Sequence, residues 1–234
     1  MSWLRRLFGA GPRLTMEQSL ALAAYHARPE IPAATPLATL RCVVVDVEAT
    51  GLDPFTDRLI SIGAVSVEDR TVRLGSGFEV VLCQPQASSR ANILIHGIDG
   101  TSQLAGLDPA TALISFLDYA ERAPLVGFHA DFDRALIDRA ATNALGRAPS
   151  LVWLDLAYLA PALLAKPGMA VPQGLDAWSQ QFGITNHARH NALADALATA
   201  QLLQVVLARA IAAGFTTLAD LQRIEKDQRW LGRH

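Results

Sequence analysis

Two carboxylates, those of Asp46 and Glu48, end an apolar run that begins at Cys42 and has the composition of a buried strand. Side chains two positions apart on a strand share one face, so both carboxylates project together where the apolar run stops. Adjacent carboxylates repel each other unless a proton or a cation lies between them, and hard oxygen ligands suit Mg²⁺ or Mn²⁺. The sequence therefore predicts a core strand with a divalent metal site at its end.

The remaining pattern predicts one mixed sheet with helices on its faces. With 234 residues, of which 51% are hydrophobic, the chain can bury one substantial core. Apolar runs between turn residues predict strands at 41–48, 58–67, 72–82, 125–128 and 151–154. Helical periodicity predicts helices at 109–122, 132–145, 155–165, 174–182 and 191–213. This order is typical of an α/β fold in which three antiparallel strands form a meander and later strands pair in parallel.

Three segments are expected along the chain. Residues 1–39 form an N-terminal helical extension, in which a helical run at 16–28 is followed by proline-containing chain. The main domain covers residues 40–213, and residues 214–234 form a C-terminal helical tail.

Composition limits location and partners only loosely. The richest apolar stretch, 196–215, contains two glutamines and Arg209, so no transmembrane segment is predicted and a cytoplasmic location is expected. The net charge of −2 supplies no global basic field, so binding to a nucleic acid must use a local patch or bound cations. Cys42 and Cys83 form no metal-binding spacing, and we expect both in the core.

A further acid, Asp133, follows the short apolar strand that ends near Phe128. A helix that begins after such a strand can bring an acid to the same sheet edge as the first pair, so Asp133 is a candidate for the metal site. Asp131, two positions earlier, fits the ordinary role of a helix cap or of a first-turn acid that complements the helix dipole.

His190 and Asp195 lie at the start of the last long helical run. On a continuous helix, residues five positions apart point about 140° away from each other, so these two would not share a face. We therefore expect His190 on a loop ahead of the helix, able to move towards whatever Asp195 binds. A single loop histidine is usually just solvated, so its role depends on the other motifs.

Together these segments resemble the DEDDh exonucleases, also called the DnaQ-like family, which include the proofreading subunit of the bacterial replicative DNA polymerase. The family's first motif, Asp-x-Glu-Thr-Thr-Gly-Leu, is similar to residues 46–52. Its second motif, which ends Phe-Asp, is similar to Phe132-Asp133, and its third, His-x-Ala-x-x-Asp, is similar to residues 190–195. The motifs occur in the family's order, and the resemblance covers about residues 40–210.

The resemblance implies a ribonuclease H-like fold and hydrolysis that releases nucleoside monophosphates from a 3′ end with two divalent cations, Mg²⁺ or Mn²⁺. One cation acidifies the attacking water, and the other stabilises charge on the leaving oxygen. Asp46 would bridge both ions, Glu48 and Asp195 would complete the ion on the side of the nucleophile, and Asp133 would support the other ion. His190 would be the general base, since a histidine, with an ordinary pKa of about 6.5, accepts protons at neutral pH.

The resemblance also implies residues that contact the substrate. Thr50 and Leu52, on either side of Gly51, would contact the terminal nucleotide, the first by hydrogen bonds and the second as an apolar wedge beside the base. The segment also fits a simple turn of the chain. His129 occupies the position of a family asparagine; it either replaces the asparagine's contact with substrate or ends the strand.

The favoured substrate is a single-stranded DNA with a free 3′ end, in proofreading or repair. An exoribonuclease of the same family is the alternative enzyme, because DNA and RNA differ at the 2′ hydroxyl and the residues that contact it are not evident. A non-catalytic, polymerase-accessory module that binds nucleic acid is the alternative outside enzymes. A polymerase or a sliding clamp is a possible partner, the clamp because residues 18–22 faintly resemble clamp-binding peptides; one face of an amphipathic helix explains them more simply.

Overall fold

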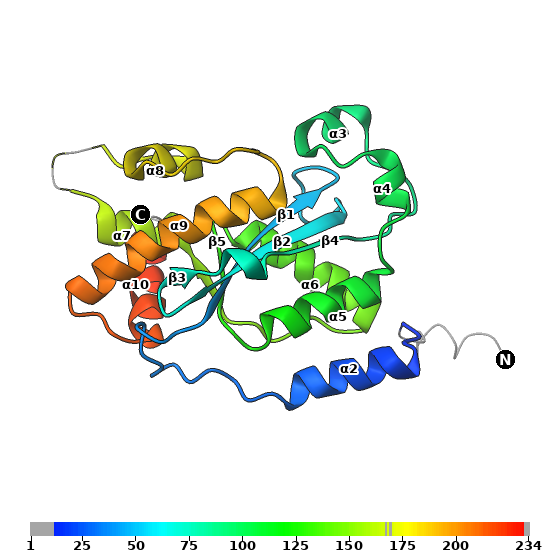
Figure 1. The fold of residues 1–234 in the computed structure, drawn as a ribbon, viewed down its shortest axis with the longest axis horizontal. Coiled ribbons are helices and arrows are strands. Elements are labelled where there is room, and N and C mark those ends of the chain that lie inside the picture. The colour runs from blue at the N-terminus through cyan, green and yellow to red at the C-terminus, as the bar shows by residue number, and fades with distance from the viewer. Residues whose placement is uncertain (1–11, 167, 169, 232–234) are drawn as a thin grey trace.

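Buried strands form a single mixed sheet in the computed structural model, which describes residues 12–166, 168 and 170–231. The sheet has the order β3-β2-β1-β5-β6, and β4 also pairs with β2 (Figure 1). Its strands are β1 (Cys42–Ala49), β2 (Leu59–Glu68), β3 (Thr71–Val72), β4 (Phe78–Val81), β5 (Leu125–Gly127) and β6 (Trp153–Asp155). The first strand lies at the centre because its apolar residues are buried on both faces.

Strand directions agree with the predicted meander followed by parallel strands. β1 is antiparallel to β2 and parallel to β5, and β5 is parallel to β6. The prediction of one continuous strand at 72–82 was wrong, because a 3-10 turn, η1 (Leu74–Ser76), separates β3 from β4. Glycines at 75 and 77 flank Ser76 and favour a break, since glycine weakens a strand and permits tight turns.

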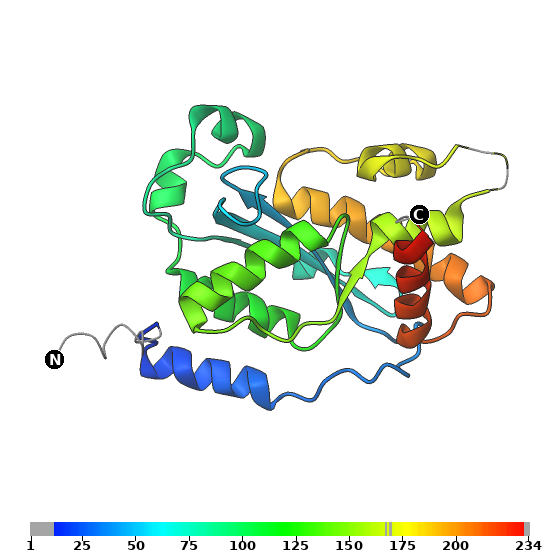
Figure 2. The same ribbon diagram turned by 180° about the vertical axis from the view of Figure 1, so that it is seen from behind.

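Helices cover both faces of the sheet. Against one face lie α5 (Pro109–Ala120) and α6 (Asp131–Leu145), with α2 (Met16–Ala27) packed on α5. The other face carries α7 (Leu156–Leu164), α8 (Gly174–Phe182), α9 (Ala192–Ala212) and α10 (Leu218–Leu231). Figure 1 shows α9 crossing the sheet, and Figure 2, seen from behind, shows the opposite face covered by α5 and α6. The predicted α/β fold is confirmed.

Two short helices were not predicted, α3 (Arg90–His96) and α4 (Gly100–Leu104). Each begins after a residue whose side chain accepts a hydrogen bond from the first turn, Ser89 for α3 and Asp99 for α4. These caps were the available signal, but seven and five residues are too few to show helical periodicity.

The N-terminal and C-terminal segments are joined by backbone hydrogen bonds. The N–H of Leu37 donates to the carbonyl oxygen of Thr216 at 2.8 Å, and the N–H of Ala219 donates to that of Ala33, also at 2.8 Å. Leu37 is fully buried in the core beneath α10. The boundaries proposed at 39/40 and 213/214 stay predictions, and residues 1–11 and 232–234 of the two end segments lie outside the described chain.

Within the described ranges, α9 is the one helix long and apolar enough to cross a membrane. Of its most apolar window, 56% is buried inside the protein, and α9 packs on β1 and β2. A helix that is buried against a sheet has the environment of a core helix.

Gly63 allows the start of α9 to lie directly on β2. A Cβ atom at this position would be 2.2 Å from the backbone nitrogen of Leu193 and 2.3 Å from the carbonyl carbon of Ala192. Both distances are far below van der Waals contact, so any side chain at 63 would force the helix away from the sheet. Gly63 also faces Asp46 across the β1–β2 register. The glycine therefore decides how closely α9 approaches Asp46.

We expect Gly63→Ala to lower the free energy of unfolding by about 1–3 kcal/mol, because an added methyl group would overpack the interface between β2 and α9. Urea unfolding followed by circular dichroism measures the change. Gly75→Ala is the matched control, since a Cβ atom there meets nothing within 4 Å. Equal stability of the two variants would contradict the proposed role of Gly63.

Candidate functional site

Three predicted acids converge at one end of the sheet. Asp46 and Glu48 lie on β1, and Asp195 lies in the first turn of α9. Each offers one carboxylate oxygen, and these three oxygens lie within 4.8 Å of one another. Asp195 reaches the pair because α9 begins against Gly63, opposite Asp46. This arrangement has the ligand type and spacing to hold a divalent cation.

The fourth predicted acid, Asp133, comes to the same edge from the other side of β1. β5 runs parallel to β1, so α6, which follows β5, begins near the end of β1 that carries the acids. Asp133 is 5% exposed, and its charge helps to raise the pKa of Asp46. The structure therefore brings all four predicted acids to one edge.

Burial and mutual repulsion disfavour the charged forms of these carboxyl groups. Burial raises the pKa of Glu48 to about 8, and the charge of Asp195 adds to this shift. Burial also raises the pKa of Asp46 well above its ordinary value, and Asp133, Asp195 and Glu48 add to this shift. Such crowding is relieved by protons or by a bound cation.

Asp195 is held by groups from the loop before α9. Its Oδ1 accepts hydrogen bonds from Asn186 and, at 2.6 Å, from Nη1 of Arg189. Its Oδ2 accepts the backbone N–H of His190 at 3.0 Å. Arg189 also pairs with Asp176 of α8 at 2.8 Å. Arg189 therefore joins α8 to the site, and its charge lowers the pKa of Asp46 and Glu48 against the larger effect of burial.

His190 lies ahead of the helix, as predicted. The helix begins at Ala192 after the cap residue Asn191, and the His190 side chain is exposed. Its φ is +62°, a left-handed conformation that histidine adopts more readily than most side chains. The backbone of His190 is tied to Asp195, whereas its imidazole points from a loop.

The predicted substrate residues Thr50 and Gly51 form a locked turn. The Thr50 hydroxyl donates to Asp57 at 2.8 Å and accepts the N–H of Arg58 at 2.9 Å. A Cβ atom at Gly51 would lie 2.5 Å from Oδ2 of Asp57, so any side chain there would displace the carboxylate that holds Thr50. Leu52, which follows, is 91% exposed. The turn thus presents an apolar side chain to solvent, and substrate contact by these residues stays a prediction.

His129 is exposed, and its φ of +62° ends β5. Asparagine and histidine are both enriched in this left-handed conformation, which gives a physical reason why either residue fits at this position. A contact between the His129 side chain and substrate stays a prediction.

Asp155 was missed by the sequence analysis. It is 1% exposed, and its carboxylate accepts the backbone N–H groups of His129 at 3.0 Å, Ala130 at 3.1 Å and Ala157 at 2.9 Å. It thereby holds the start of α6, the helix that carries Asp133. An acid directly after a short apolar strand was the available signal, since parallel strands end at one sheet edge.

The C-terminal helix holds Asp155 in turn. Arg229 of α10 contacts Oδ2 of Asp155 at 3.3 Å and Asp131 at 2.6 Å, and Glu225 accepts the N–H of Asp155 at 3.2 Å. Asp131, which was assigned an ordinary helix-terminal role, forms this ion pair and makes no cap hydrogen bond. Cys83, expected in the core, is only half-buried, whereas Cys42 is buried.

Comparisons with known proteins agree with this geometry. Residues 43–203 match the family model of RNase T type that is described as "Exonuclease". The DNA polymerase III subunit epsilon-like protein of Rhodobacter capsulatus is 33% identical over 203 residues, and the match covers 84% of this chain and 28% of that protein. The chain thus spans less than a third of the length of this relative.

Solved structures share the fold. Exonuclease I of E. coli, in complex with a dT13 oligonucleotide, has a TM-score of 0.61 at 20% identity, covering 74% of this chain and 42% of that one. Exonuclease X, in complex with 5′ overhanging duplex DNA, has a TM-score of 0.59 at 19% identity, covering 79% of this chain and 99% of that one. At these identities the likeness shows the fold alone.

The raised pKa values predict how stability depends on pH without metal. A carboxyl group whose pKa rises on folding adds stability below its ordinary pKa, 4.5 for Glu48, and loses that contribution as the pH rises through about 8. In EDTA we expect Tm to fall as the pH rises from about 4.5 to about 8. The fall should be smaller in Asp46→Asn, which has one fewer of the crowded carboxyl groups. Mg²⁺ should raise Tm most at the upper end, because a cation binds the deprotonated groups. A Tm indifferent to Mg²⁺ throughout would contradict a metal site here.

Removing Arg229 should loosen the start of α6. We expect Arg229→Gln to cost about 3 kcal/mol in urea unfolding, the lower end for breaking a buried ion pair, because Arg229 is itself 24% exposed. Hydrogen exchange at the amides of His129 and Ala130 should become faster. Arg223→Gln, which breaks an exposed pair with Asp220, should cost at most about 1 kcal/mol. Unchanged exchange in Arg229→Gln would contradict this role.

Proposed function

Because this chain belongs to the DnaQ-like family of 3′–5′ exonucleases, we propose that it releases nucleoside monophosphates from the 3′ ends of single-stranded DNA by metal-dependent hydrolysis. The observation that carries the proposal is the convergence of Asp46, Glu48 and Asp195 within 4.8 Å, with Asp133 buried beside them. Crowded, buried carboxylates are costly to maintain, and a binding module without metal chemistry would not require them.

The donor set fits hard divalent cations, Mg²⁺ or Mn²⁺. All four side chains offer carboxylate oxygens, and among the residues that the structure describes the cluster of Asp46, Glu48 and Asp195 includes no cysteine or histidine. Asp46 would contribute to two ions, one shared with Glu48 and Asp195 and one supported by Asp133. When bound, the ions would acidify the attacking water and stabilise the negative charge that develops on the leaving 3′ oxygen.

His190 would accept the proton of the attacking water. Its imidazole is exposed on a loop, while its backbone N–H is fixed to Asp195. This arrangement ties the base to a metal-binding residue without using either ring nitrogen for that bond. The ring can therefore turn towards the water when a substrate is aligned.

The turn after β1 would contact the terminal nucleotide. Hydrogen bonds to Asp57 and Arg58 hold Thr50 rigidly, so Leu52 projects from a fixed base and would pack beside the terminal nucleobase. His129 would lie on the opposite side of the site, at the end of β5. A rigid turn lowers the entropic cost of ordering these contacts.

The names of related proteins favour DNA and a polymerase partner. The Rhodobacter relative is described as epsilon-like, and the two solved structures contain single-stranded and overhanging DNA. A sliding clamp has less support, because Gln18 in the clamp-like segment already closes the capping box of α2 and binds Asp108. We therefore propose a DNA end, with a polymerase as the favoured partner.

The direct test follows shortening of 3′-labelled single-stranded DNA, mismatched duplex and RNA, each with Mg²⁺ or Mn²⁺. We expect DNA to be shortened one nucleotide at a time and Asp46→Asn to lose at least about 1,000-fold in rate, since metal ions contribute several kcal/mol to such reactions. Asp138→Asn on α6, paired with Arg134, is the matched control. Faster shortening of RNA would favour an exoribonuclease, and no shortening of any strand would favour a binding module.

His190→Ala tests the general base separately. We expect its rate to fall by about 100- to 10,000-fold, the usual contribution of general base catalysis, while DNA binding is retained. His187→Ala is the control, because His187 is exposed in the same loop. An unchanged rate in His190→Ala would remove His190 from this role.

A further inference from the structure

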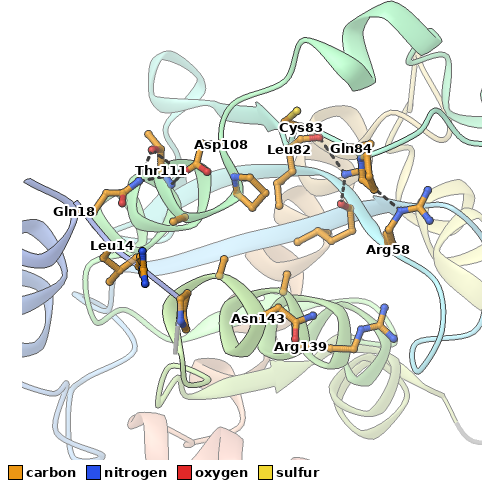
Figure 3. A pocket seen from close by; sticks show the side chains of 18 of the residues that line it. Leu14, Gln18, Arg58, Leu82, Cys83, Gln84, Asp108, Thr111, Arg139 and Asn143 are labelled. Atoms are coloured by element: carbon orange, nitrogen blue, oxygen red, sulfur yellow. Dashed lines mark hydrogen bonds between the residues drawn. The ribbon is translucent and has the colours of Figure 1, made fainter. Parts of the chain in front are cut away.

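A cavity lies beside the turn that follows β1, and Arg58, at the end of that turn, lines it. Its volume is about 690 Å³, it is open to solvent, and it is lined by the start of α2, the start of α5, the middle of α6 and the chain after β4 (Figure 3). None of the four acids of the metal site lines it. Cavities of this size hold small molecules, whose binding sites usually measure 300–1,000 Å³.

Two arginines lie at one end of this cavity. Figure 3 shows the guanidinium groups of Arg58 and Arg139 at the same end. Arg58 donates through Nε to Gln84 at 3.1 Å and through Nη2 to the carbonyl oxygen of Gln86 at 3.2 Å. Nη1 of Arg139 is buried and makes no hydrogen bond to any described residue. Neither arginine forms an ion pair in the described ranges, although Arg139 contributes to lowering the pKa of the exposed Asp53.

Arg139 has a hydrogen-bond donor that no described residue uses. A buried guanidinium N–H without an acceptor loses the hydrogen bond that it would make to water. Planar guanidinium groups suit phosphate oxygens, which can accept two parallel hydrogen bonds. The side-chain amide of Gln84 donates hydrogen bonds to the carbonyl oxygens of Leu59 and Leu82. These bonds hold Gln84 in place, and its side-chain oxygen in turn accepts the hydrogen bond from Arg58. The guanidinium groups of Arg58 and Arg139, both in the lining, therefore give this end of the cavity the chemistry to bind an anion.

The remaining wall suits a flat, largely apolar body. Leu14, Leu82, Leu136 and Ala140 line it, and they provide surfaces against which a ring can pack. The side-chain amide of Asn143, also in the lining, makes no hydrogen bond within the described part of the chain and offers both a donor and an acceptor. An anionic group, a flat ring and polar ring edges are the three parts of a nucleotide.

We propose that this cavity binds a nucleoside monophosphate, with its phosphate between Arg58 and Arg139 and its base against the apolar wall. The preference for an anion follows from the two arginines in the cavity lining. The choice of a mononucleotide rests on the proposed function, because that reaction releases nucleoside monophosphates.

Occupancy of the cavity would be felt at the turn beside the metal site. The backbone N–H of Arg58 donates to the hydroxyl of Thr50, and Asp57 accepts the hydrogen bond of that hydroxyl. A phosphate that binds the Arg58 side chain therefore contacts the same residue whose backbone holds Thr50, and with it Leu52, in place. Binding of a released nucleotide in the cavity would therefore affect the turn that is proposed to contact the next terminal nucleotide.

The test uses the full chain carrying Asp46→Asn, in EDTA, so that hydrolysis plays no part in the result. A deoxynucleoside 5′-monophosphate is titrated by calorimetry, and alkylation of Cys83 by iodoacetamide is timed in parallel. Cys83 lines the cavity and is half-buried, whereas Cys42 is fully buried with its pKa raised to about 12, so only Cys83 reacts appreciably. These are the two cysteines of the chain.

We expect the mononucleotide to bind and to slow alkylation of Cys83. Arg139→Gln should weaken binding about tenfold or more, since it removes charge-assisted hydrogen bonds. Arg139→Lys, which keeps the charge, should bind better than Arg139→Gln and guards against a loss of fold, which circular dichroism checks. Arg73→Gln is the control, because Arg73 pairs with Glu68 and Asp69 outside the lining.

Wild-type affinity in Arg139→Gln would overturn the proposal. So would equal protection by inorganic phosphate, which would indicate an anion site without base recognition. If a single-stranded oligonucleotide slowed alkylation of Cys83 and the mononucleotide did not, the proposal of a free mononucleotide would be wrong and the cavity would bind a strand. Because the assay involves no cleavage, a failure here leaves the exonuclease proposal untouched, and a failure of that proposal leaves this result interpretable.

Discussion

The structure around the site holds four carboxylates together at one sheet edge against their mutual repulsion, two of them buried and two half-buried. Asp46 and Glu48 cannot move apart, because β1 is buried on both faces between β2 and β5. Gly63 admits the start of α9 and with it Asp195, and Asp155 fixes the start of α6 and with it Asp133. The fold thus holds together groups that would separate in a flexible chain, which is the preorganisation that metal-dependent hydrolysis requires.

The parts of this arrangement that depend on local pattern could be predicted from the sequence. The apolar strand ending in Asp46 and Glu48, and the helix geometry that separates His190 from Asp195, needed only periodicities of two and 3.6 residues. Contacts between distant segments could not be predicted. Asp155 and Arg229 are 74 positions apart, and their pairing depends on how α10 packs against α7 and β6. The broken third strand was missed because a 3-10 turn of three residues has no periodicity to detect.

Acidic and basic side chains form separate groups near the turn at 50–58. Crowded acids lie at the end of β1, and Arg58 and Arg139 line a cavity that none of these acids lines. Within the turn, the carboxylates of Asp53 and Asp57 are held by hydrogen bonds from backbone N–H groups and from the Thr50 hydroxyl. The short turn at 50–58 therefore lies between a site suited to metal ions and a site suited to phosphate. The first would serve hydrolysis, and the second would bind the nucleotide that hydrolysis releases.

The hydrogen bonds between residues 33–37 and 216–219 give the molecule a mechanical property. They anchor the start of α10 to the chain that enters β1, while the far end of α10 holds Asp155 through Arg229. The segment before β1 is therefore connected mechanically to the start of α6 through α10, Arg229 and Asp155. In this fold, tension on the N-terminal segment is carried along this path of contacts to the helix that bears Asp133.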